Sequence, residues 1–290
     1  MPGILHSAAK IALHRAGGLR VARLMNRGGL RILMYHRFHD RAALARQCAH
    51  VRANYRPVSL TAVAEWLHEG RALPPHAVAV TVDDGYRDFA DVAHPVFAEY
   101  GIPVTVYLVT DFLDGKLWLW FDRVKYAFRD TGREMADLAV TWSEADRRRW
   151  IDELPEVPEQ PPPEYAPLSW DTVRELAAAG VEFGAHSKTH PILSGVVDDA
   201  ELRDEIAGSR ARIECQLDRP VPHFCYPNGK TRDIGPRVVE AVRSAGMRTA
   251  VTAEPGLNRA GQDALLLRRM AADPGHAEEY FAQGLAGLRG

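Results

Sequence analysis

Residues 77–85 read AVAVTVDDG. The first six are small or β-branched, which is typical of a buried strand, and the polar residues and glycine that follow are typical of its end. Similar runs at 31–35 (RILMY) and 103–109 (PVTVYLV) predict two more strands. Because residues 86–100 have helical periodicity, residues 77–109 form a predicted strand–helix–strand unit, which indicates a parallel sheet.

Short apolar runs and helical segments continue to alternate toward the C-terminus. We expect strands at 181–185, 221–226, 248–252 and 265–267, and a closing helix at 276–288. Strand–helix units in this number favour an α/β barrel over an open sheet. With 46% hydrophobic residues, the 290-residue chain has enough apolar mass for a sizeable core. A formal net charge of −2 gives no indication of binding to nucleic acid, so we expect no such partner.

Residues 1–29 form a basic amphipathic segment. No acidic residue precedes Asp40, whereas seven lysines and arginines do, and apolar residues are interleaved with them. The apolar runs are too short for a secretory signal or a membrane span, so we expect a cytoplasmic protein. The segment is either a surface helix that covers the domain or a peripheral contact with the anionic inner face of a membrane.

Asp83 and Asp84 follow the predicted strand 77–82 directly. Two adjacent carboxylates repel each other unless a cation or a shared proton relieves the repulsion. Active sites of α/β folds also lie at the carboxyl ends of strands. One aspartate can therefore bind a metal while its neighbour faces the substrate. The alternative is an ordinary polar turn, because Asp-Gly is a common turn dipeptide.

His186 and His190 follow the predicted strand 181–185. At a spacing of four residues, two imidazoles share one face of a helical turn, which suits a single metal ion. Ser187 stands where a zincin would have its glutamate, so the pattern is not that of a zincin. Together with Asp84, the two histidines would provide three ligands and leave a position open for water or a carbonyl oxygen.

Two other strand ends carry candidate residues. Tyr226 lies in FCYPNG (224–229), where an exposed backbone N–H near the turn could hold an oxyanion. His36 lies in MYHR (34–37), and a histidine with a near-neutral pKa is a suitable general acid. An ordinary β-turn and a structural polar residue, respectively, are the alternatives.

The four motifs in this order resemble the polysaccharide deacetylase family, also called the NodB-homology or carbohydrate esterase 4 family. The resemblance covers residues 31–270, and TVDDG (81–85) with HSKTH (186–190) carries most of it. The chain is most similar to the branch that contains the poly-N-acetylglucosamine deacetylases. The resemblance implies a distorted (β/α) barrel of the NodB-homology type.

It also implies a role for each motif residue. Asp83 would be the general base, and Asp84, His186 and His190 would bind a divalent metal, usually zinc. In this reading the backbone N–H of Tyr226 holds the oxyanion and His36 protonates the leaving amine. The expected function is removal of N-acetyl groups from amino sugars. The open alternatives are a metal hydrolase of another amide or ester and a catalytically weak glycan-binding relative.

The sequence departs from the family pattern in three places. Cys225 occupies the place of the arginine that orients the base in many members. Residues 266–270 (LLRRM) contain no Leu-x-His motif. Residues 117–167 form a helical insertion into a catalytic domain expected at 30–290, and we expect most of the insertion's tryptophans to pack inside it rather than to stack on sugars.

The expected substrate is an N-acetylated glycan or a lipid-linked saccharide. An extracellular polymer would require export, and no export signal is visible in the sequence. A lipid-linked or nucleotide-linked sugar would fit a cytoplasmic enzyme. The basic segment at 1–29 would then lie at the membrane face beside a lipid-linked substrate.

Overall fold

The computed structural model describes residues 17–154, 157–158 and 160–288. Its strands form one sheet in the order β7-β6-β5-β4-β3-β1-β8, with β2 paired to β3. All of these pairings are parallel. The strands are β1 Arg31–Tyr35, β2 Arg56–Pro57, β3 Ala77–Val82, β4 Val104–Leu108, β5 Glu182–Ala185, β6 His223–Cys225, β7 Thr249–Val251 and β8 Met270–Ala271. The parallel pairing and the helices that link the strands confirm the predicted distorted (β/α) barrel.

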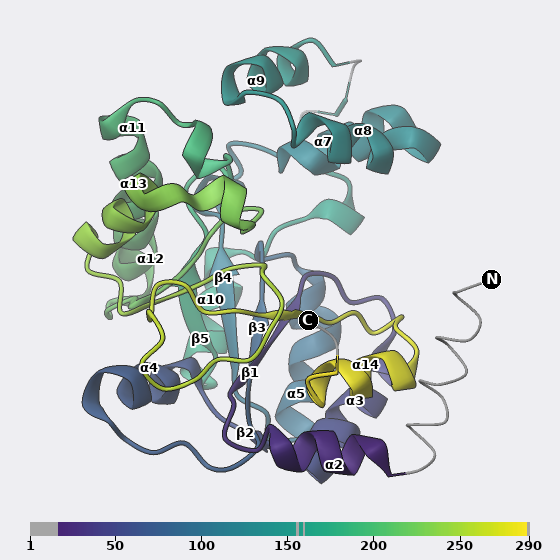
Figure 1. Cartoon of the computed structure of the whole chain (residues 1–290). Coiled ribbons are helices and arrows are strands. Elements are labelled where there is room, and N and C mark those ends of the chain that lie inside the picture. Colours follow the sequence, from purple (N-terminus) through teal and green to yellow (C-terminus); the bar gives the residue numbers. More distant parts are fainter. Residues whose placement is uncertain (1–16, 155–156, 159, 289–290) are drawn as a thin grey trace, which may run out of the picture.

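The helices surround this sheet (Figure 1). Helices α12 and α13 flank one side, α3, α5 and α14 lie toward the other, and α7, α8 and α9 form a separate layer at one end. The helices are α2 Gly18–Met25, α3 Arg41–Asn54, α4 Leu60–Glu69, α5 His94–Glu99, α6 Thr110–Leu113, α7 Trp120–Phe128, α8 Gly132–Ala139, α9 Glu144–Asp152, α10 Trp170–Ala178, α11 Asp199–Arg203, α12 Ser209–Leu217, α13 Thr231–Ser244 and α14 Glu278–Leu285. The layer α7–α9 confirms that residues 117–149 are mainly helical.

Strand β3 lies inside the sheet, between β4 and β1, and the two aspartates follow its last residue. All six of its residues are buried, as expected for a parallel strand that is covered on both faces. Its last residue, Val82, pairs with Tyr35 of β1 and with Val106 of β4. This register brings the carboxyl ends of the three strands to one edge.

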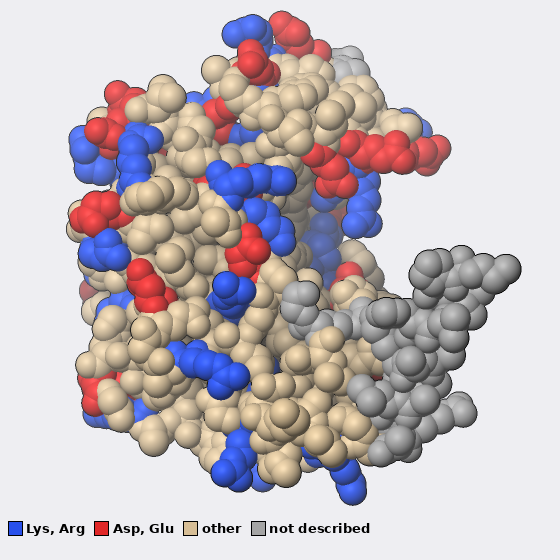
Figure 2. Space-filling view, viewed as in Figure 1, with Lys and Arg blue, Asp and Glu red and all other residues tan. Residues whose placement is uncertain are grey.

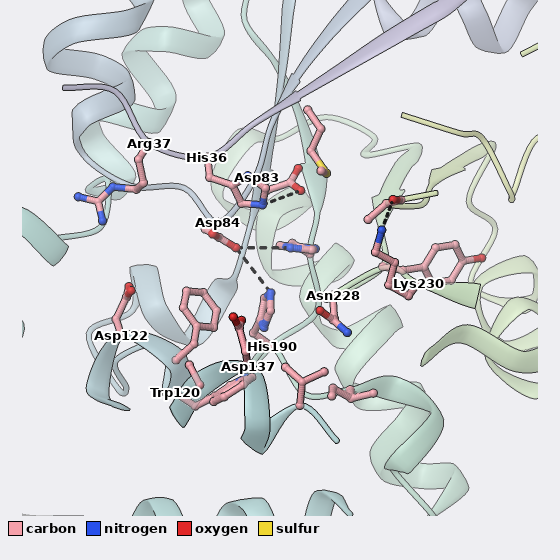
Figure 3. Close-up of a pocket in the computed structure, with 18 of the residues that line it drawn as sticks. His36, Arg37, Asp83, Asp84, Trp120, Asp122, Asp137, His190, Asn228 and Lys230 are labelled. Carbon is pink, nitrogen blue, oxygen red and sulfur yellow. Dashed lines mark hydrogen bonds and ion pairs between the residues drawn. The ribbon is translucent and has the colours of Figure 1, made fainter. Parts of the chain in front are cut away.

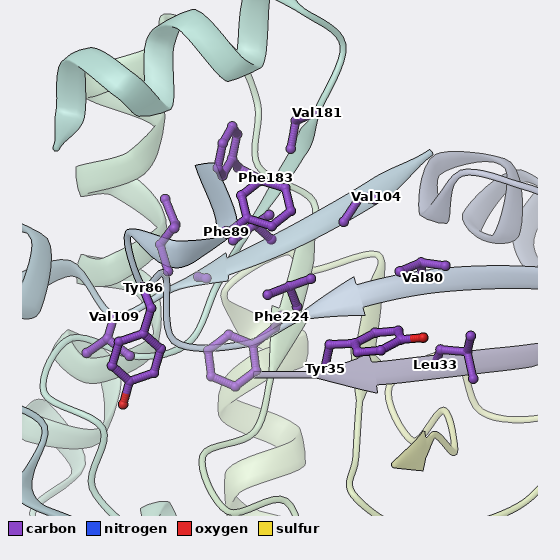
Figure 4. Packing of buried hydrophobic residues seen from close by; sticks show 14 of the residues in the cluster. Leu33, Tyr35, Val80, Tyr86, Phe89, Val104, Val109, Val181, Phe183 and Phe224 are labelled. Atoms are coloured by element: carbon purple, nitrogen blue, oxygen red, sulfur yellow. The ribbon is translucent and has the colours of Figure 1, made fainter. Parts of the chain in front are cut away.

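The core fills the space between the sheet and its helices with large aromatic and aliphatic side chains (Figure 4). Tyr35, Phe89 and Phe224 are at most 2% exposed, and Val80 and Val104 pack in the same cluster. Burial on this scale, at roughly 25 cal/mol per Å² of apolar surface, is the main favourable contribution to folding. The strand ends above this core are therefore held in fixed positions.

The prediction of a final strand at residues 265–267 is wrong. Residues 265–267 form a turn with a single bridge from Leu267 to Val251, and the final strand is β8. Asp263 makes the turn, because its carboxylate accepts a hydrogen bond from the N–H of Leu265 at 2.9 Å and its carbonyl accepts one from the N–H of Leu266. Leu265 and Leu267 are thus buried and Leu266 is exposed, and only Leu267 forms a bridge to β7.

Part of the basic N-terminal segment, residues 1–16, lies outside the described residues. Helix α2 belongs to the described part of this segment, and its Val21, Leu24 and Met25 are exposed. Among the described residues, no helix is both long enough and apolar enough to cross a membrane.

Candidate active site

Residues from four strand ends meet in one cavity of about 680 Å³ (Figure 3). Asp83 and Asp84 follow β3, His36 follows β1, His186 follows β5 and Tyr226 follows β6. Parallel strands place their carboxyl ends at the same edge, so residues distant in sequence become neighbours. The structure therefore brings together the side chains that the separate motifs predicted.

The first cluster in this cavity has the donor set of a metal site. Asp84 Oδ1 lies 3.5 Å from His186 Nε2 and 3.6 Å from His190 Nε2. One donor atom from each residue falls within a 4.8 Å cluster. Asp84 Oδ1 is buried and accepts no hydrogen bond within the described part of the chain. A buried carboxylate oxygen that faces only imidazole nitrogens is stabilised by a bound cation, so these residues fit a divalent metal such as zinc.

The position of the His186 ring is set by a backbone contact. Its Nδ1 lies 2.8 Å from the carbonyl oxygen of Cys225. Because a carbonyl only accepts hydrogen bonds, Nδ1 carries a proton, and Nε2 is the ring nitrogen that faces Asp84. Metal-binding histidines are commonly oriented in this way by a second hydrogen bond. Strand β6 therefore supports the metal site through its backbone.

The predicted helical turn at 186–190 is wrong. Ser187 has φ 63° and His190 has φ 61°, both in the left-handed region, so the segment is an irregular turn. The N–H of His190 donates to Ser187 Oγ at 3.0 Å, and the carboxylate of Glu205 accepts from the N–H of Lys188 and of Thr189 at 2.9 Å. The turn still brings the His186 and His190 rings to 4.8 Å between centroids.

Asp83 is held by Arg269, which the sequence did not identify as a functional residue. Two parallel hydrogen bonds join the groups, from Arg269 Nη1 to Asp83 Oδ1 at 2.6 Å and from Nη2 to Oδ2 at 2.8 Å. Both residues are 2% exposed. Burial alone would raise the pKa of Asp83, but the guanidinium outweighs it and the net shift is downward. Asp83 is therefore an ionised carboxylate.

Arg269 also explains the departure at Cys225. Its Nη2 lies 3.1 Å from Cys225 Sγ, and its Nε donates to the carbonyl of Thr252 at 2.7 Å. A guanidinium thus reaches Asp83 from the segment before β8, beside the strand that lacks the expected arginine. The reading of the chain as a catalytically weak relative rested on that missing arginine and loses this support. In the sequence, only the basic pair Arg268-Arg269 after an apolar run marks the position.

His36 lies at the mouth of the cavity. Its Nε2 is 3.6 Å from Asp83 Oδ2, and its side chain is 47% exposed whereas that of Asp83 is 3% exposed. A substrate that reaches Asp83 therefore passes beside the imidazole. This placement permits proton transfer to a leaving group, while the role itself stays a prediction.

The backbone of Tyr226 is already engaged. Its N–H donates to the carbonyl of Val251 at 3.2 Å, and its hydroxyl donates to the carbonyl of Leu265 at 3.0 Å. An oxyanion would have to compete with Val251 for this N–H. The role predicted for Tyr226 stays a prediction that requires a change in this hydrogen bond.

Helices α7 and α8 supply the wall opposite the strand ends. Trp120 and Phe121 line the cavity, and the ring of Phe121 lies 5.2 Å from that of His190. The hydroxyl of Tyr86, two residues after Asp84, donates to Asp122 of α7. This bond ties the helical layer to the loop that carries the aspartates.

The other tryptophans of the layer confirm the prediction of internal packing. Trp150 stacks on Phe128 at 5.7 Å and meets Trp142 edge to face at 5.0 Å. Trp118 is 6% exposed and stacks on Tyr165. Of the four tryptophans in residues 117–167, only Trp120 lines the main cavity.

Comparison with known proteins gives related sequences. The family model described as polysaccharide deacetylase matches residues 70–250. The putative polysaccharide deacetylase YxkH of Bacillus subtilis (strain 168) is 20% identical over 212 residues, which cover 73% of this chain and 57% of that protein. The poly-beta-1,6-N-acetyl-D-glucosamine N-deacetylase of Escherichia coli (strain K12) is 25% identical over 259 residues, which cover 83% of this chain and 35% of that protein. The chain thus spans only part of the length of these relatives.

Two solved structures share the fold. The Streptococcus pyogenes deacetylase PplD in complex with acetate matches with a TM-score of 0.66 at 18% identity, over 89% of this chain and 98% of that one. IcaB from Ammonifex degensii matches with a TM-score of 0.63 at 20% identity, over 89% of this chain and 97% of that one. At this identity the likeness is one of fold.

Proposed function

This chain belongs to the polysaccharide deacetylase family, and we propose that it is a metal-dependent hydrolase that removes N-acetyl groups from the amino sugars of a glycan or glycan precursor. The observation that carries the proposal is the pair of neighbouring carboxylates with different partners. Asp84 faces two imidazoles, and Asp83 faces a guanidinium. Such a pair can hold a cation on one carboxylate and keep the other ionised as a base.

Asp84, His186 and His190 would hold the metal, and their one oxygen and two nitrogen donors suit zinc. A divalent ion held there supplies a Lewis acid that polarises a carbonyl and lowers the pKa of water. The chain's own contribution is to fix the ligands before binding. The Cys225 carbonyl orients His186 and the Ser187 hydroxyl holds the turn at His190.

Asp83 would act as the general base. Its carboxylate is kept ionised by Arg269, and a proton taken from water would rest on Oδ2, the oxygen nearer to His36. His36 would then give a proton to the nitrogen that leaves as an amine. The backbone N–H of Tyr226 would contribute to the oxyanion only after releasing Val251. The products would be acetate and a free amino sugar.

We also propose a peripheral contact with the inner face of a membrane, in a cytoplasmic protein that acts on a lipid-linked saccharide. The support is α2, where Val21, Leu24 and Met25 are 60%, 59% and 79% exposed and Arg20 and Arg27 lie beside them. Exposed apolar side chains flanked by arginines suit an anionic lipid surface. Cell fractionation tests this: recovery in the periplasm or medium would contradict it.

The first experiment measures acetate release from N-acetylglucosamine oligomers by zinc-loaded protein, beside the Asp83→Asn and His186→Ala variants. We expect release by the wild type and loss in both variants. A simple acetyl ester is the second substrate, because the same core chemistry serves hydrolases of other amides and esters. Cleavage of the ester without cleavage of the sugar amide would replace the proposal by that broader alternative.

A further inference from the structure

A second hollow adjoins the cavity at Asp83 and Asp84, beside the helical layer. This hollow has a volume of about 560 Å³. Its lining consists of three cations, two tyrosines and one glutamate, namely Lys125, Arg129, Arg133, Tyr126, Tyr165 and Glu164. Lys125 and Arg133 line both spaces, so the two spaces adjoin at these side chains. We call these six residues the cationic hollow.

Two of the three cations of the cationic hollow, Arg129 and Arg133, have no ion-pair partner in the described part of the chain, and the hollow contains one carboxylate, that of Glu164. Lys125 pairs with Asp122 at 3.1 Å and lies 4.7 Å above the ring of Phe121. Arg129 and Arg133 are exposed, and neither forms a hydrogen bond or ion pair with any residue that the structure describes. Figure 2 shows lysine and arginine side chains gathered in the recess below the uppermost helices. Two free guanidiniums beside a third cation attract an anion with several acceptor oxygens.

The position of this charge relates it to the reaction. The acetamido group of a substrate must lie at Asp83 and Asp84, on the strand side of the cavity. The remainder of the sugar then extends toward α7 and α8, where Arg133 lines the same wall. A neutral glycan has no charge that would pair with the two guanidiniums at that point, whereas a phosphate ester carries up to two negative charges.

We infer that the cationic hollow binds the phosphate or diphosphate of an N-acetylamino sugar joined through that group to a carrier. The inference rests on the proposed deacetylase function and specifies its substrate class. Arg129 and Arg133 contact the phosphate oxygens, and Lys125 approaches from the side nearer to the metal ligands. The carrier is either a nucleoside or a polyprenyl lipid, because both present the same diphosphate chemistry.

The test compares three substrates with zinc-loaded protein: UDP-N-acetylglucosamine, polyprenyl-diphosphate N-acetylglucosamine in detergent, and a neutral N-acetylglucosamine oligomer. The variants are Arg129→Gln and Arg133→Gln, singly and together, and Arg149→Gln is the matched control. Arg149 is an exposed arginine of α9 that does not line the hollow. All three positions are exposed, so the substitutions leave the core intact.

We expect a KM for at least one phosphate-linked substrate that is at least about tenfold below that of the neutral oligomer. The double variant should raise that KM by about tenfold or more, with kcat and the neutral KM unchanged, and Arg149→Gln should have no effect. The better of the two phosphate substrates identifies the carrier. Equal KM values for all three substrates, or equal losses on charged and neutral substrates, would overturn the inference.

A binding measurement separates this inference from the proposed function. Calorimetry with UDP-N-acetylglucosamine and with the polyprenyl-diphosphate sugar uses the Asp83→Asn protein, in which no turnover is expected. Binding that weakens about tenfold when Arg129 and Arg133 are replaced supports the phosphate subsite even if no acetate is released by the wild type. Absence of binding by both phosphate-linked sugars would refute the subsite even if a neutral oligomer is deacetylated.

Discussion

The strand ends and the helical layer α7–α9 face each other across one cavity, but they are built differently. At the strand ends, Asp83 and His186 are 2% exposed and each is held by a partner from another strand or its flanking segment. In the layer, Arg129 and Arg133 are exposed and have no partner among the described residues. The side chains at the strand ends are therefore fixed by partners before any ligand binds, whereas the layer presents cations that have no such partner.

Replacement of a predicted metal ligand at the strand ends should have the largest effect on activity. We expect Asp84→Asn and His186→Ala each to lower kcat/KM on the order of 10³-fold or more, because the ion and its Lewis acidity are lost. Zinc content by mass spectrometry should fall in parallel. The exposed His39 serves as the control, and His39→Ala should retain metal and activity. A zinc-free variant with full activity would show that the reaction does not depend on this site.

Arg269→Gln should impair the proposed base, Asp83, without loss of the metal. Because Asp83 would remain buried without its guanidinium, we expect its pKa to rise, kcat to fall roughly 10²-fold and the free energy of unfolding to fall by about 3–5 kcal/mol, with zinc still bound. Kinetics, zinc content and denaturant unfolding are the measurements. The neighbouring Arg268→Gln is the control, since Arg268 contacts the carbonyl of Pro255 at the surface. Unchanged kcat in Arg269→Gln would remove Arg269 from the catalytic arrangement.

Glu144→Gln should loosen the helical layer from the strand ends. Glu144 is 8% exposed, accepts hydrogen bonds from Arg147 and Arg148 of the same helix, and accepts one from the N–H of Ile192 at 3.2 Å, two residues after His190. We expect the free energy of unfolding to fall by about 1–3 kcal/mol and KM to rise by less than about tenfold. Glu134→Gln on α8 is an exposed control. A change in zinc content would mean that the layer also shapes the metal site.

Replacement of Asp114 should have the smallest effect of the four, and it should change stability but not catalysis. It joins the end of α6 to α10 and α12 through Trp170 Nε1 and Arg212 Nη2, both at 2.7 Å, and it pairs with Lys116 at 2.9 Å. Burial alone would raise the pKa of Asp114, but the hydrogen bonds from Arg212, Lys116 and Trp170 lower it to about 2. Since the unfolded value is about 3.9, its stabilisation is complete above that pH and is lost as the pH falls toward 2.

Asp114→Asn should accordingly lower the free energy of unfolding at neutral pH by about 1–2 kcal/mol and leave kcat unchanged. The difference from the wild type should shrink as the pH falls from about 4 to 2. Denaturant unfolding across this range measures both. A difference that stays constant with pH would show that the charge of Asp114 is not what stabilises these contacts.

The sequence predicted the strand ends better than the rest of the cavity. Asp83, Asp84 and His36 could be placed together because each follows an apolar run, and parallel runs end at one edge. The geometry at His186 and His190 could not be deduced, because spacing alone does not report the left-handed backbone of that turn. The conformation of this turn is set by tertiary contacts, among them the hydrogen bonds to Glu205.

Arg269 was missed for a different reason. Its role depends on where the C-terminal chain passes, and no local pattern distinguishes it from Arg268. The last strand was misplaced nearby, because the turn made by Asp263 overrode the apolar run at 265–267. Periodicity locates elements, but it does not tell which distant side chain compensates a buried charge.

The pairing of Asp83 with Arg269 also has a consequence for biosynthesis. The two residues are separated by 186 positions in the chain. At about 5–20 residues per second, a ribosome makes Asp83 roughly 10–40 s before Arg269. Until then, burial of Asp83 would leave its charge uncompensated, which is strongly unfavourable. The ion pair at this edge of the sheet therefore forms only after most of the chain has been translated, so a nascent chain contains Asp83, Asp84, His186 and His190 before the partner of Asp83 exists.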